Sequence, residues 1–273
     1  MAVTRHTYVT REALKAAAGW EADVDDALAD RLIESHSGKV DELFHRHFYP
    51  RIATRRYDWP SRSQVSSSIL WLDADLLEVR AFTASGSEVS SDDYILGPDD
   101  IDGGPYDRIE LESGITFGTG GQRSLEVDAV WGYSREATAA GALAGVLSDS
   151  ATTIPATAHT GVDVGDLLFI DDEALIVTDR RIVAMVDTYL VQRGAYGTTA
   201  AQHAQGATVT RNVPPGLIRD LVIAECIAQR VQEDGGYNAS IGPNGIGATD
   251  RIPLLDVRAR CREAYARTER IAL

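Results

Sequence analysis

The stretch FYPRIATRRYDWP, Phe48–Pro60, marks the point at which the pattern of the chain changes. Before it, apolar residues recur every three or four positions from Val24 to Phe44, which is the spacing of an amphipathic helix. Pro50 ends this pattern, because proline lacks the backbone N–H that a helix interior needs. From Ile52 onward, short runs rich in β-branched and aromatic residues alternate with clusters of Gly, Pro, Asp and Ser. Such alternation is typical of strands joined by turns.

The same two patterns recur on either side of this stretch. Tyr8–Gly19 predicts a short helix with Thr10 as its N-cap and Gly19 at its end. Two successive sets of strand-like runs follow, and Pro214 and Pro215 then open a further helix, which precedes a last one. The order of helices, strands, strands and helices favours an α+β fold over a regular βαβ alternation. We expect a helical bundle-like core with long N-terminal and C-terminal helices, a short-stranded β unit and a small β module resembling a barrel or sandwich.

Composition places the chain among ordinary globular proteins, since 44% of its 273 residues are hydrophobic and 25% are charged. Its apolar runs fall short of the roughly 18 residues that a membrane helix needs, and its first segment lacks the apolar region of a signal peptide. We therefore expect a cytoplasmic protein without membrane contact. The formal charge of −15 disfavours a protein that grips nucleic acid, which needs clustered Lys and Arg. DNA sliding past an acidic wall stays compatible with this charge.

The reactive residue types show no catalytic or metal-binding pattern. Cys226 and Cys261 each lie in a helical pattern, and we expect both to be reduced packing residues. His45 and His47 are two positions apart, which points their rings to different faces of a helix and disfavours a zinc site. The sequence also lacks a nucleophile elbow, a phosphate-binding loop and a dinucleotide fingerprint. We expect no enzyme activity, catalytic residue, cofactor or metal.

The segment RGAYGTTAAQH, Arg193–His203, invites interpretation as an active-site loop. We interpret it as structural: Gly194 and Gly197 permit tight turns, and His203 is a turn or packing residue without an acid or cysteine at ligand spacing. Three acidic groups are interpreted as solvated turns, because aspartate nucleates turns. These groups are Asp92–Asp93, Asp99–Asp102 and Asp171–Glu173.

Six segments, together with the long helix ahead of Pro50, carry a resemblance to a known family. They are YVTREALKAAAG (8–19), FYPRIATRRYDWP (48–60), LWLDADLLEVRAFTASGSEVSSDDYIL (70–96), PYDRIEL (105–111), VDAVWGYS (127–134) and VPPGLIRDLVIAECIAQRV (213–231). In this order they resemble the head-to-tail connector, or adaptor, proteins of tailed bacteriophages. The resemblance covers residues 7–134 and 213–270, and the WGY ending followed by the VPP helix is its most telling part.

The resemblance implies a structural protein of the virion neck. Family members assemble in the host cytoplasm into a ring, usually of twelve copies, beneath the portal protein. The ring extends the DNA channel, lets double-stranded DNA pass without sequence-specific binding, and presents a surface to a tail terminator or stopper protein. Simpler members lack a counterpart of residues 135–212, so these residues are expected to form an inserted β module on the outside of the ring. Residues 1–134 and 213–273 are then the connector core.

The resemblance also indicates where partners bind, because the C-terminal segment of family members commonly inserts into the portal. The portal-contact candidates are Tyr265, Arg267, Arg270, Ile271, Ala272 and Leu273. The glycine-rich loop Asp234–Arg251, between the last two predicted helices, is suited to becoming ordered against a partner. Its interface candidates are Tyr237, Asn238, Ile241, Asn244 and Ile246. Opposed charges in Arg5–Lys15 and Asp23–Arg31 are expected to supply part of the contact between subunits.

A second hypothesis from another class stays open. The second β unit could be a ligand-binding module of a carbohydrate- or surface-binding protein, or of a hydrolase, with the acidic groups as sugar or metal contacts. Stabilisation by calcium would favour this reading, since a ligand of the folded state raises the melting temperature.

Overall fold

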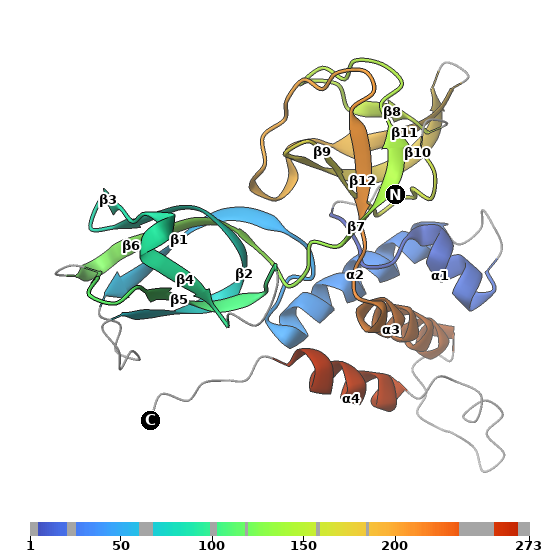
Figure 1. The fold of residues 1–273 in the computed structure, drawn as a ribbon. Coiled ribbons are helices and arrows are strands. Elements are labelled where there is room, and N and C mark those ends of the chain that lie inside the picture. Colours follow the sequence, from blue (N-terminus) through green and yellow to red (C-terminus); the bar gives the residue numbers. More distant parts are fainter. Residues whose placement is uncertain are drawn as a thin grey trace, which may run out of the picture. The chain divides into compact units, whose positions relative to one another are not determined.

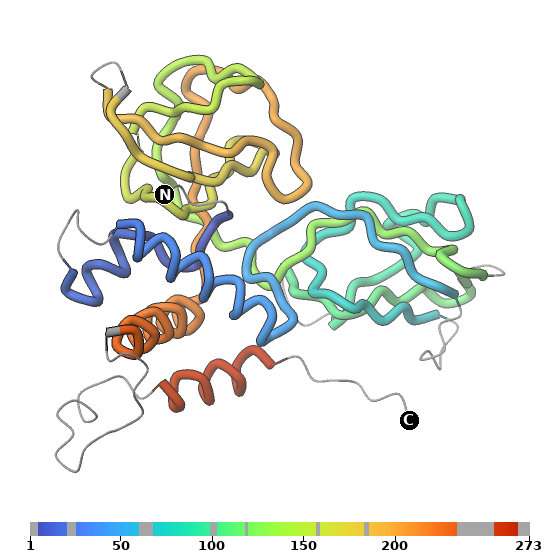
Figure 2. Tube along the Cα trace, turned by 180° about the vertical axis from the view of Figure 1, so that it is seen from behind, coloured from blue at the N-terminus to red at the C-terminus, as the bar shows by residue number. Residues whose placement is uncertain are grey.

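The computed structural model of the protein describes residues 5–20, 26–59, 68–98, 103–117, 120–156, 159–183, 186–234 and 254–266 (Figure 1). These residues divide into two compact units. The mixed unit holds the described residues of 1–45, 137–195 and 199–267, and the sheet unit holds those of 46–136 and 196–198. The chain therefore leaves the mixed unit after α2, builds a sheet and returns, as the trace in Figure 2 shows.

Helices occur in the mixed unit. They are α1 (Arg11–Ala18), α2 (Asp26–Phe44), α3 (Gly216–Asp234) and α4 (Leu254–Tyr265). The Thr10 hydroxyl accepts a hydrogen bond from the N–H of Ala13, and Gly19 is left-handed with φ 68°, so both predicted ends of α1 are confirmed. Helix α2 packs against α1 and α3, and α3 packs against α4. Leu32 on α2 and Leu221 on α3 are fully buried in this layer.

The sheet unit is one antiparallel sheet in the order β1-β6-β2-β5-β4, with β3 paired to β2. Its strands are β1 (Arg51–Trp59), β2 (Ile69–Ala84), β3 (Ser87–Glu88), β4 (Tyr94–Gly97), β5 (Tyr106–Leu111) and β6 (Gly121–Trp131), with a 3-10 turn, η1 (Ser91–Asp93), before β4. Strand β2 spans 16 residues, and bulges near Leu76 let it pair with β5 as well as β6. The aromatic side chains of Phe82, Phe117 and Trp131 are buried in its core.

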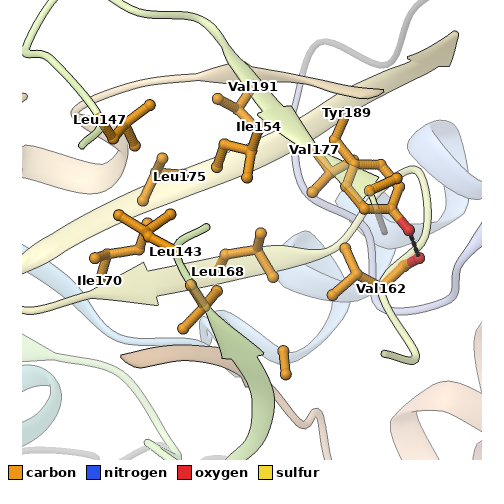
Figure 3. Close-up of a cluster of buried hydrophobic side chains, with 13 residues drawn as sticks. Leu143, Leu147, Ile154, Val162, Leu168, Ile170, Leu175, Val177, Tyr189 and Val191 are labelled. Carbon is orange, nitrogen blue, oxygen red and sulfur yellow. Dashed lines mark hydrogen bonds between the residues drawn. The ribbon is translucent and has the colours of Figure 1, made fainter. Parts of the chain in front are cut away.

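The second sheet, in the mixed unit, has the order β7-β12-β9-β10-β11-β8. Its strands are β7 (Ala137–Ala142), β8 (Thr153–Pro155), β9 (Leu167–Ile170), β10 (Glu173–Val183), β11 (Val186–Gln192) and β12 (Thr208–Asn212). Figure 3 shows the aliphatic cluster that this sheet buries, in which Leu168 and Leu175 are fully inaccessible. The Tyr189 hydroxyl donates a 2.6 Å hydrogen bond to the Val162 carbonyl at the edge of the cluster.

The predicted fold class, α+β with a helical bundle-like core of long terminal helices, is wrong. Of the described residues, 39% lie in strands and 29% in helices, and two six-stranded antiparallel sheets organise the structure. The two helices nearest the ends of the described chain, α1 and α4, have only 8 and 12 residues. The physical reason is burial: two large apolar clusters, one in each sheet, are built mainly from strand side chains rather than from helix faces.

The division into a connector core and an inserted module of 135–212 stays a prediction. The second sheet runs from Ala137 to Asn212, and the compact units group it with the helices. None of the helices among the described residues is long and apolar enough to cross a membrane.

Candidate functional site

A buried ion pair, here called the Glu173 clamp, joins three segments of the second sheet. Glu173 is the first residue of β10 and is only 1% exposed. Arg193 follows β11, and its Nε and Nη2 atoms donate to the two carboxylate oxygens of Glu173 at 2.6 and 2.7 Å. This two-bond geometry matches the planar guanidinium to the carboxylate, and it orients both side chains.

The remaining hydrogen bonds of the clamp go to the backbone. The N–H groups of Gly194 and Ala201 donate to the Glu173 carboxylate at 2.9 and 3.0 Å. Arg193 also donates to three carbonyl oxygens, at 2.7 Å to Ser148, 2.9 Å to Ala151 and 2.6 Å to Ala201. One ion pair therefore fixes the loop before β8, the start of β10 and the segment between β11 and β12.

His203 completes the clamp and is 2% exposed. Its Nε2 lies 2.9 Å from Glu173 Oε2, and its Nδ1 lies 2.7 Å from Asp171 Oδ2. Its backbone pairs with that of Leu147 in both directions. The predicted packing role of His203 is confirmed, whereas the interpretation of Glu173 as part of a solvated turn is wrong. Sequence spacing missed both acidic partners because they lie about thirty residues upstream, at the turn between β9 and β10.

The clamp can hold loops in place, and its carboxylate is already occupied. Although burial opposes ionisation, hydrogen bonds from Arg193, Ala201, His203 and Gly194 lower the pKa of Glu173 to about 2. Both oxygens accept from these donors, so the carboxylate is saturated and poorly suited to act as a base. Gly194 and Gly197 have φ of 59° and 85°, which confirms their predicted turn roles. The RGAYGTTAAQH segment is therefore a loop-closing motif.

The charges at the start of the chain pair within the subunit. Arg11, 9% exposed, donates from Nε and Nη2 to both carboxylate oxygens of Asp30 at 2.7 and 2.6 Å. Lys15, 3% exposed, forms an ion pair with Asp26. These contacts fasten α1 to α2. Arg11 and Lys15 thus have partners inside the chain, and the expectation that the opposed charges serve the contact between subunits stays a prediction.

Two motifs of the resemblance meet in the sheet unit, at a place here called the FYP–WGY joint. The Trp131 Nε1–H donates to the carbonyl of Ala53 at 2.7 Å, which ties the end of β6 to β1. The Tyr133 N–H donates to the carbonyl of His47 at 2.8 Å. The rings of Tyr133 and Phe48 pack with centroids 5.4 Å apart. The end of the WGY segment therefore lies directly against the start of the FYP segment.

A glycine and an ion pair complete the FYP–WGY joint. Gly132 has φ 150°, and a Cβ on it would lie 2.3 Å from the Tyr49 carbonyl oxygen, so only glycine fits. Its N–H donates to the carbonyl of Asp75 at 2.9 Å. The Asp75 carboxylate in turn lies 3.4 Å from Arg46 Nε, and the Arg46 guanidinium lies 5.2 Å from the Tyr133 ring centre. Asp75 belongs to LWLDAD, a third segment of the resemblance.

Of the predicted contact residues, the structure describes Tyr265. This residue ends α4, is partly buried, and packs its ring against Phe44 at 6.5 Å, so part of its surface is used inside the chain. The remaining candidates lie outside the described residues. They are Arg267, Arg270, Ile271, Ala272 and Leu273 after α4, and Tyr237, Asn238, Ile241, Asn244 and Ile246 in the loop before it.

Both cysteines are buried and unbonded, which confirms their predicted packing role. Burial raises the pKa of the Cys226 thiol to about 12. The part of the chain that the structure describes holds no group of three or more His, Cys, Asp or Glu side chains arranged to bind a metal ion. Comparison of the chain with protein-family models, with curated proteins and with solved structures found no match.

Proposed function

We propose that this protein is a structural adaptor of a tailed bacteriophage. Twelve or a similar number of copies form a ring beneath the portal protein, extend the DNA channel and join the filled head to the tail or to a stopper protein. The adaptor works by forming interfaces and performs no chemistry.

The FYP–WGY joint is the observation that carries this proposal. Three segments that resemble the connector family are joined by contacts between residues up to about 85 positions apart, and they converge through Tyr133, Gly132 and Asp75 on one packed contact. A coincidental resemblance of short motifs would scatter them over the structure. Their convergence supports the view that the likeness reflects a shared architecture.

The Glu173 clamp also supports a structural role over the ligand-binding alternative. Glu173 and Arg193 are bonded to each other and to loop backbone, and His203 contacts carboxylates through both ring nitrogens. A binding site keeps polar groups directed at the ligand position, whereas these groups are directed at one another. The segment that most resembled an active-site loop is therefore committed to holding the second sheet together.

The decisive test is binding to the portal protein encoded in the same gene cluster. The full chain is compared with a chain ending at Ala266, which keeps the Tyr265–Phe44 contact and lacks 267–273. A second variant with I182S and V186S, on the β10–β11 hairpin, serves as a control for unspecific loss. We expect the full chain to co-sediment with DNA-filled portal heads and the shortened chain to be lost. Failure of the full chain to bind such heads would overturn the proposal.

A further inference from the structure

Helices α2, α3 and α4 form one layer in the mixed unit (Figures 1 and 2). A groove in this layer is lined by residues of all three helices. It encloses about 290 Å³. Val40 and Leu43 of α2 and Leu221 of α3 give it apolar walls. Leu43 is 42% exposed, although it sits between helices that bury most of their apolar residues. The groove thus offers room for one or two aliphatic side chains from outside the layer.

The rim of this groove is basic. Lys39 of α2 and Arg262 of α4 both line it, both are exposed, and neither has an ion-pair partner among the described residues. The neighbouring cation Arg258 is already neutralised by Glu225, its partner on α3. Two uncompensated cations beside an apolar groove are notable in a chain of net charge −15. An occupant that matches this site carries an aliphatic side chain next to two carboxylates.

The sheet unit carries such a segment. Ile95 in β4 is 45% exposed, and Asp92 and Asp93 precede it in the η1 turn. Neither aspartate has an ion-pair partner among the residues that the structure describes. Among the described strands, β4 lies at the edge of its sheet and pairs with β5 on one side. The segment Asp92–Ile95, here called the acidic edge, therefore presents apolar surface and two negative charges.

The other exposed aliphatic residues of the described chain fit the groove less well. Ile182 and Val186 flank the tip of the β10–β11 hairpin, but the nearby carboxylates of Asp179 and Asp187 already pair with arginines. Leu255 is on α4, which forms a wall of the groove itself. Val146 stands in a loop with a single acid close by in sequence.

We propose that the acidic edge of one copy docks in the basic groove of a second copy. Ile95 contacts Leu43 and Val40, while Asp92 and Asp93 pair with Lys39 and Arg262. Because the two surfaces in contact differ, the contact is head-to-tail. A copy that uses its acidic edge on one neighbour still has its basic groove for the next. Such a contact closes a ring when the rotation between copies allows it. This contact rests on the proposed function, because it would join neighbouring copies in the proposed ring. The test below omits the portal protein, so a negative result would count against this contact and would leave portal binding to a separate experiment.

The test is charge reversal with rescue in the full-length protein. The first variant carries K39E and R262E, the second carries D92K and D93K, and the third carries all four substitutions. Self-association is measured by sedimentation velocity up to about 100 μM protein, which detects dissociation constants up to about 1 mM. Circular dichroism checks that each variant is folded. The matched control carries I182S and V186S, which remove exposed apolar surface elsewhere in the mixed unit.

We expect the wild-type chain to associate in a concentration-dependent way, and high salt to weaken the association because exposed charges take part. Each pairwise reversal should weaken it by about tenfold or more, since attraction becomes repulsion at both positions. The fourfold variant should regain association to within about threefold of wild type, and the control should match wild type. A wild-type chain that stays monomeric, a fourfold variant that stays as weak as the reversals, or a control that dissociates would each overturn the proposal.

Discussion

Replacing Arg193 by Met tests the Glu173 clamp most directly. The substitution keeps an unbranched aliphatic side chain and removes the guanidinium that donates to Glu173 and to the carbonyls of Ser148, Ala151 and Ala201. The Glu173 carboxylate is then left buried with a charge and without its cationic partner. Removing one member of a buried ion pair costs about 3–5 kcal/mol, so we expect the free energy of unfolding to fall by that amount.

The assay is urea unfolding followed by circular dichroism, with amide hydrogen exchange in β10 reporting on the second sheet. Arg181→Met is the matched control, because Arg181 pairs with Asp179 on the surface with 54% of its side chain exposed. Such pairs contribute less than about 1 kcal/mol. In the double variant Arg193→Met/Glu173→Gln, the loss should be smaller than the sum of the single losses by about 2 kcal/mol, since the stranded charge is gone. Equal losses for Arg193→Met and Arg181→Met would refute the clamp.

Two further predictions concern pH and backbone strain. Burial raises the pKa of Asp166 to about 7. The folded state therefore holds this proton more tightly than the unfolded state does. We expect the free energy of unfolding to fall by up to about 4 kcal/mol as the pH rises from about 4 to 7. Asp166→Asn should flatten this fall in urea midpoints measured across that window, and an unchanged slope would contradict the assignment. Gly197→Ala should destabilise by about 1–3 kcal/mol, because φ is +85° and a Cβ would lie 2.0 Å from the Ile52 carbonyl oxygen. Gly206→Ala is the control, because Gly206 has φ +84° and open space around a Cβ, so that it measures the backbone strain alone. Equal losses of stability for the two variants in thermal unfolding would exclude the close contact with the Ile52 carbonyl.

Local features were predictable because their causes are local. The N-cap Thr10, the left-handed Gly19 and the turns at Gly194 and Gly197 depend on residues a few positions apart. The same holds for the long helix that ends ahead of Pro50. In each case one side chain or one backbone angle decides the outcome.

Features that depend on pairing between distant residues were missed. Strand β2 pairs with β5 over its first half and with β6 over its second half, with bulges between the paired stretches. Neither partner could be identified from the sequence pattern. Glu173 and His203 are thirty positions apart and meet because β12 lies beside β9, which leads into β10. Periodicity reports which face of an element is apolar, and it carries no information about which strand becomes the neighbour.

In the proposed adaptor, the second sheet would be an addition that is both tolerated and held in place. Its first and last strands are paired, with Ala137 opposite Asn212, so the chain returns to the position where it left. Residues can be added between such ends without moving what precedes and follows them. The sheet is nevertheless tied to the start of the chain, since the Thr7 N–H donates to the Gly165 carbonyl at 2.8 Å and the Arg11 N–H to that of Val164. These bonds help to hold the sheet and the helices in one compact unit. In the proposed ring, they would keep the sheet in the same position in every copy.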